Sequence, residues 1–139
     1  MNRNKIKTAM VLLAFVVVSA CATTPPKTNT RSVKTGESVE LVSFGFWNGD
    51  CSPKYFNLKV EKQPDHGTVE IVKSSIKIPD NPAIGTSSSK CSGRDVEGKA
   101  LNYIANDEFT GIDVVKLSVQ APGLAGWQRY VSTVNVTKK

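Results

Sequence analysis

Histidine and cysteine are scarce in this sequence of 139 residues. The only histidine is His66, and the three cysteines are Cys21, Cys51 and Cys91, with no C-x-x-C pair among them. Zinc sites usually need four Cys or His ligands, and a nucleophile needs a base within hydrogen-bond reach. We therefore expect no metal site, no cofactor site and no catalytic residue, in a protein that is not an enzyme.

Long hydrophobic runs and basic clusters are also missing. The longest apolar stretch, residues 9–18, is about half of the roughly 20 residues that a membrane-spanning helix requires. The formal charge of +6 owes much to Arg3, Lys5 and Lys7 at the start of the chain. Without these three, 15 basic residues face 12 acidic ones, and no basic run remains. A nucleic-acid partner is therefore not expected.

The first 20 residues have the layout of a secretory signal peptide: a basic start, an apolar stretch and the small residues Ser19 and Ala20. The next residue is Cys21, and this order resembles the lipobox of bacterial lipoproteins. The resemblance implies cleavage before Cys21, a diacylglycerol on its thiol and a fatty acyl chain, such as palmitate, on the new amino terminus. Several acyl chains hold a protein firmly to a membrane. An ordinary secretory signal is the alternative.

Lipoprotein sorting gives a further expectation, because an aspartate after the lipidated cysteine is typical of inner-membrane retention. The residue that follows Cys21 is Ala22. The resemblance thus implies attachment to a bacterial outer membrane, with the domain in the periplasm or at the cell surface.

The other two cysteines belong to the part of the chain that would fold outside the cytoplasm. In an oxidising compartment a pair of cysteines favours a disulfide, so we predict a Cys51–Cys91 bond. Closing a loop of about 40 residues would stabilise the fold by roughly 4 kcal/mol in the chain-entropy model.

Turn residues divide the remaining chain into short β-prone segments. We assign residues 21–35 to the lipidated N-terminus and a flexible tether, and residues 36–139 to one domain. Expected strands cover seven segments, none of them with helical periodicity: residues 38–46, 55–61, 68–72, 75–78, 100–105, 114–121 and 127–137. The expected fold class is an all-β, Ig-like antiparallel β-sandwich of about seven strands, with a small closed barrel as the alternative.

Two motifs carry a second resemblance. Residues 64–69 read Pro-Asp-His-Gly-Thr-Val, and residues 103–119 keep the spacing of Tyr103, Phe109, Gly111 and Asp113 before an alternating strand. This pattern resembles the Ig-like and cadherin-like modules of bacterial surface proteins. We expect Phe109 to plug a corner of the sandwich and Gly111 to permit the bend after it. Asp113 would accept hydrogen bonds from the turn, and Tyr103 would bury its ring and pair its hydroxyl.

The chain departs from that pattern where calcium-dependent relatives place an acidic residue, because Gln120 is neutral. Calcium prefers several oxygen ligands, mostly carboxylates. A calcium site at Asp107, Glu108 and Asp113 is therefore not expected.

Candidate contact residues lie in two segments without clear strand pattern. They are Trp47, near a Gly-containing stretch, and Lys90 and Arg94 in a long loop over residues 80–98. A third, weaker candidate is the turn over residues 121–127. We expect a binding or structural module that meets an envelope protein or the cell wall. The alternatives are an inhibitor or small enzyme acting through residues 80–98, and a glycan-binding module with an exposed aromatic platform.

Overall fold

The computed structural model describes residues 24–80 and 89–139 of the chain. The described part contains seven strands and one short 3-10 turn, η1 (Ser89–Cys91), joined by loops. Within it, no helix is long and apolar enough to cross a membrane. The strands are β1 (Lys27–Lys34), β2 (Ser38–Phe44), β3 (Asn57–Lys62), β4 (Gly67–Lys77), β5 (Asp95–Ala105), β6 (Gly111–Gln120) and β7 (Gln128–Thr137).

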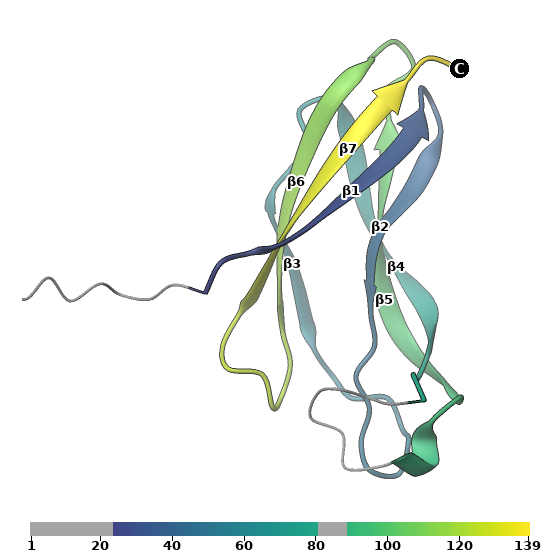
Figure 1. Ribbon diagram of the computed structural model, residues 1–139, viewed down its shortest axis with the longest axis vertical. Helices are drawn as coiled ribbons and strands as arrows, with labels where there is room; N and C mark the ends of the chain where they lie inside the picture. The colour runs from purple at the N-terminus through teal and green to yellow at the C-terminus, as the bar shows by residue number, and fades with distance from the viewer. Residues whose placement is uncertain (1–23, 81–88) are drawn as a thin grey trace, which may run out of the picture.

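The strands form two sheets packed face to face (Figure 1). One sheet has the order β1-β7-β6-β3 and the other has the order β2-β5-β4. With β2, β5 and β4 taken as strands B, E and D, and β3, β6 and β7 as C, F and G, this is the order of an immunoglobulin-like sandwich. The all-β sandwich expected from the sequence is confirmed, and the closed barrel is wrong, because the two sheets remain separate.

Alternating side chains of both sheets meet between them, as two packed sheets require. Leu41, Leu101 and Tyr103 from one sheet face Val115 and Leu117 from the other. All five are fully buried or nearly so. The alternation predicted for the segment that forms β6 is confirmed, since Val115, Leu117, Val119 and Ala121 all lie inside.

The predicted tether is wrong over most of its length, because β1 spans Lys27–Lys34. It pairs in parallel with β7, so one pair in the sandwich is not antiparallel. Only Val33 of this strand is buried. Asn29 donates to the backbone oxygen of Leu41 (2.6 Å), and Arg31 donates to that of Glu40 (3.2 Å). The strand is therefore held by backbone pairing and polar contacts with β2, which an apolar pattern cannot reveal.

Two other boundaries also differ from the prediction. The segments predicted as separate strands over residues 68–72 and 75–78 form one continuous strand, β4, along all of β5. The predicted loop over residues 80–98 ends earlier, because β5 begins at Asp95. The number of strands agrees with the prediction only because the merged pair offsets the added β1.

Candidate functional site

Three connections share one end of the sandwich, which we call the loop end: those after β2, β4 and β6. The pairing register requires it, since Asn57 at the start of β3 pairs with Gln120 at the end of β6. Likewise, Lys77 at the end of β4 pairs with Asp95 at the start of β5. Figure 1 shows the described parts of these connections at the bottom, opposite the C-terminus.

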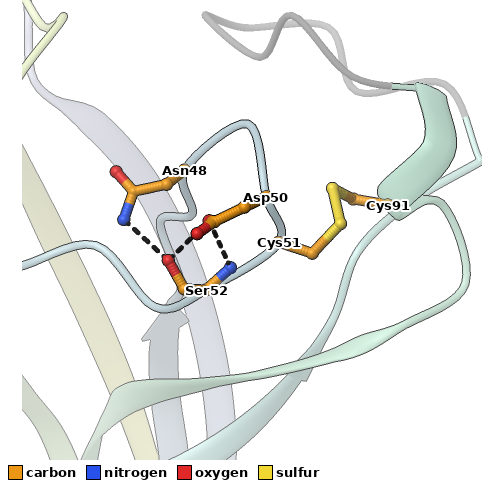
Figure 2. Close-up of a disulfide and its surroundings, with 5 residues drawn as sticks. All are labelled: Asn48, Asp50, Cys51, Ser52 and Cys91. Atoms are coloured by element: carbon orange, nitrogen blue, oxygen red, sulfur yellow. Dashed lines mark hydrogen bonds between the residues drawn. A yellow bond between two sulfur atoms is a disulfide. The ribbon is translucent and has the colours of Figure 1, made fainter.

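The connection after β2 is a compact, hydrogen-bonded turn (Figure 2). Asp50 accepts from both the backbone N–H and the hydroxyl of Ser52, at 3.0 and 2.6 Å. Asn48 donates its side-chain amide to the Ser52 hydroxyl at 3.0 Å. The hydrogen bonds from Ser52 hold the pKa of Asp50 below its ordinary value. This carboxylate is therefore charged at neutral pH and fixes the turn.

The predicted disulfide is confirmed, and it links this turn to the connection after β4. Cys51 and Cys91 are bonded, with their Cα atoms 5.5 Å apart (Figure 2). Cys51 has a φ of 71°, which is uncommon for a residue other than glycine. Its N–H donates to the backbone oxygen of Asn48 at 2.9 Å. The bond thus links the turn after β2 covalently to the η1 segment.

Trp47 does not stand out as an exposed contact residue. Its side chain is half-buried and packs with Cys51 against a small cluster of Ile78, Cys91 and Val96. Its indole nitrogen is buried and has no hydrogen-bond partner among the described residues. Trp47 therefore packs beside the disulfide, and its role as a partner contact stays a prediction.

The two predicted basic contact residues lie at the surface beside the disulfide. Lys90 is exposed within η1, and Arg94 is exposed just before β5. The backbone around them is anchored, since Ile78 donates to the oxygen of Arg94 at 2.8 Å. Residues 81–88 of the predicted 80–98 loop lie outside the described residues, as does Cys21.

The connection after β6, which contains the weaker candidate turn over residues 121–127, supplies an exposed aromatic side chain. Trp127 is 45% exposed, whereas Leu124 packs on the cluster of Phe56, Val119 and Ala121. Of these two residues, only Leu124 is packed against the core.

The opposite end of the sandwich, which we call the corner end, brings the two motifs of the sequence together. Asp113 accepts from the N–H groups of Asp65 (2.9 Å) and His66 (2.8 Å) and from the hydroxyl of Tyr103 (3.1 Å). His66 stacks on Phe109 with ring centroids 4.0 Å apart. The structural roles expected for Tyr103, Phe109 and Asp113 are confirmed.

These contacts shift the pKa values of Asp113 and Tyr103 at the corner end. Burial by itself would raise the pKa of Asp113, but hydrogen bonds from three backbone N–H groups and from Tyr103 outweigh it, and the pKa is lowered. Burial, together with the neighbouring Asp113 charge, raises the pKa of the Tyr103 hydroxyl. Tyr103 therefore remains a donor and Asp113 an acceptor at neutral pH, so neither group is suited to proton transfer.

Metal coordination has no visible basis in the part of the chain that the structure describes. Over residues 24–80 and 89–139, no group of three or more His, Cys, Asp and Glu side chains is placed to hold a metal ion. Asp107 and Glu108 are exposed, while Asp113 is committed to the corner.

Comparisons with known proteins give no family assignment. No protein-family model matches the sequence, and no curated protein sequence matches it. Among solved structures, the solution structure of amebosin is similar at 16% identity and a TM-score of 0.43, covering 81% of this chain and 99% of amebosin. A family 123 glycoside hydrolase from Clostridium perfringens is similar at 13% identity and a TM-score of 0.46, covering 81% of this chain and 23% of the enzyme.

The cysteine protease inhibitor EhICP2 from Entamoeba histolytica is similar at 12% identity and a TM-score of 0.36, covering 81% of this chain and 88% of the inhibitor. These three similarities are too weak to support any inference about activity, ligand or partner. The chain itself forms an immunoglobulin-like sandwich. Hydrogen bonds to Asp113 hold its corner end, and the Cys51–Cys91 disulfide lies at its loop end.

Proposed function

We propose that this protein is a lipid-anchored protein of the bacterial envelope whose Ig-like domain binds a protein partner through the loop end. The observation that carries the proposal is the Cys51–Cys91 bond, which ties the turn after β2 to the short η1 segment that carries the exposed Lys90. Binding to preorganised loops avoids much of the entropy cost of ordering them.

The residues around the disulfide suit a partner with acidic and apolar groups. Lys90 and Arg94 are exposed there, and Trp127 exposes part of its ring in the connection after β6 at the same end. Tryptophan and arginine are enriched among residues that dominate binding energy at interfaces. The proposed partner is therefore an envelope protein with a complementary acidic patch.

The proposed anchor limits how far the domain can lie from the membrane. Cys21 lies six residues before Lys27, where β1 begins. A fully extended chain spans at most about 3.6 Å per residue, so the start of β1 would lie within about 22 Å of the lipidated residue. The domain would be held close to the membrane, closer than a tether to residue 35 would allow.

The anchor is tested by labelling cells with radioactive palmitate. We expect label in the wild-type chain and none in Cys21→Ala, with Cys51→Ala as the matched control that keeps its label. Label retained in Cys21→Ala would contradict the anchor.

The binding surface is tested separately, with a photo-crosslinking amino acid placed at single positions in living cells. We expect a discrete adduct from positions 90, 94 and 127, and none from position 107 at the corner end. Equal adducts from position 107, or none from the three loop-end positions, would contradict the proposed surface.

A further inference from the structure

Tyr55 is the most exposed of the large hydrophobic side chains in the described residues, at 75%. It follows the disulfide-linked turn and precedes β3. Its hydroxyl donates to the side-chain oxygen of Asn57 at 2.8 Å. The ring is thus exposed to solvent, and its orientation is fixed by this hydrogen bond. Its exposure means that the ring contributes little to packing of the domain.

A cleft of about 170 Å³ lies beside this ring. Its walls come from the segment before β3 and from the facing parts of β4 and β5; they are Pro53, Lys54, Tyr55, Phe56, Lys73, Glu97, Gly98 and Lys99. Pockets for drug-sized ligands hold about 300–1,000 Å³. The cleft is therefore of a size to admit one ring-sized unit of a longer molecule.

Lys99 gives the cleft an uncompensated positive charge. Lys99 is half-buried, and its ammonium lies 5.7 Å from the centroid of the Tyr55 ring and 5.0 Å from that of Phe56. It donates one hydrogen bond, to the backbone oxygen of Phe56 at 3.3 Å. An ammonium has three donors, so two remain for a ligand.

No carboxylate of the protein neutralises this ammonium. All 12 acidic residues of the chain fall within the described ranges, and none of them forms an ion pair with Lys99 or Lys54 there. Glu97, the acidic residue of the cleft, pairs with Lys73 at 3.3 Å. The cleft as a whole is therefore positive, and an anionic group that entered it would find unused donors.

We propose that this cleft binds a sugar unit that carries a carboxylate, as part of an acidic glycan. The C–H face of a sugar ring fits against an aromatic face, whose π-system is electron-rich. Its carboxylate would pair with Lys99 and Lys54, and its hydroxyl groups would find donors and acceptors in Lys73 and Glu97. The site uses residues other than the proposed contacts Lys90, Arg94 and Trp127, and it does not depend on the lipid anchor.

The test is a titration of the full-length chain in neutral detergent, followed by amide NMR shifts. The probes are trigalacturonic acid, the neutral trisaccharide galactotriose and inorganic phosphate. We expect saturable shifts at residues 53–57 and 97–99 with trigalacturonic acid, at least about tenfold weaker binding of galactotriose, and weakening by added salt. No shift, equal binding of galactotriose, or the same shifts with phosphate alone would overturn the proposal.

Three variants separate the cleft from general charge effects. Tyr55→Ala, at a largely exposed position, should weaken trigalacturonic acid about three- to tenfold. Lys99→Met should weaken it about tenfold or more, while Lys99→Arg retains binding. Lys116→Met removes an exposed charge from β6, outside the cleft, and should change nothing. Thermal melting confirms folding of each variant, and equal losses in Lys116→Met and Lys99→Met would refute the site.

Discussion

The two ends of the sandwich are stabilised in different ways. At the corner end, Asp113 is 2% exposed and holds the turn before β4 through hydrogen bonds. At the loop end, a covalent bond between Cys51 and Cys91 is added to the hydrogen bonds of an exposed turn, and Lys90 and Arg94 remain exposed beside it. Side chains consumed by a polar lock are unavailable for binding, whereas a disulfide fixes loops and leaves their side chains free.

Removal of the disulfide should have the largest effect on stability. We expect the double variant Cys51→Ala, Cys91→Ala to lose about 4 kcal/mol in the free energy of unfolding, because the unfolded chain regains the entropy of a loop of about 40 residues. Urea denaturation of the wild type and the variant measures it. A loss below about 1 kcal/mol would show that the loop end is held by other contacts.

The corner end should be disrupted by Asp113→Asn. The amide cannot accept from two backbone N–H groups and a hydroxyl as the carboxylate does, so we expect a loss of about 3 kcal/mol. Asp107→Asn, at an exposed position nearby, is the control and should stay within about 0.5 kcal/mol of the wild type. Equal behaviour of the two variants would mean that the corner is not a lock.

Acid should weaken the corner end in the wild type. The folded-state pKa of Asp113 lies below its ordinary value of 3.8, so its stabilisation is fully present above about pH 4. It is lost as the pH falls through the folded-state pKa. Urea midpoints measured from pH 7 to pH 2 should therefore fall less steeply in Asp113→Asn than in the wild type. Parallel profiles would assign the acid sensitivity to other carboxylates.

The smallest effect on stability is expected from Trp127→Ala at the loop end. The ring is 45% exposed, and we expect a change within about 0.5 kcal/mol, together with a clear loss of adduct formation by a crosslinker at position 90. Thermal melting and crosslinking of the same variant measure both quantities. A large loss of stability with unchanged crosslinking would make Trp127 a packing residue.

Much of the corner end could be predicted from sequence because its roles depend on residue type and spacing. A turn of Pro-Asp-His-Gly followed by a later Asp113 and Tyr103 needs partners for its backbone groups, and those two side chains are suited to provide them. The pairing of Cys51 with Cys91 could also be predicted, since Cys21 was already assigned to another role and left only one pair.

Other features of the structure could not be predicted from the sequence. The strand β1 carries one buried residue, so its stability comes from backbone pairing with β7, about a hundred residues later. The exposure of Tyr55 and the burial of Trp47 were also beyond reach, because both lie in the same aromatic stretch and differ only in what packs over them.

The sequence by itself determined the all-β class, the alternation that builds the core, the disulfide and the polar lock of the corner end. These features follow from residue type, periodicity and local backbone chemistry. Only the tertiary structure decided that β1 joins the sandwich, that Trp47 is packed under the disulfide, and that Tyr55 stands beside the unpaired ammonium of Lys99. The physical reason is that exposure and charge compensation are set by neighbours distant in sequence, which only the pairing of the sheets brings into contact.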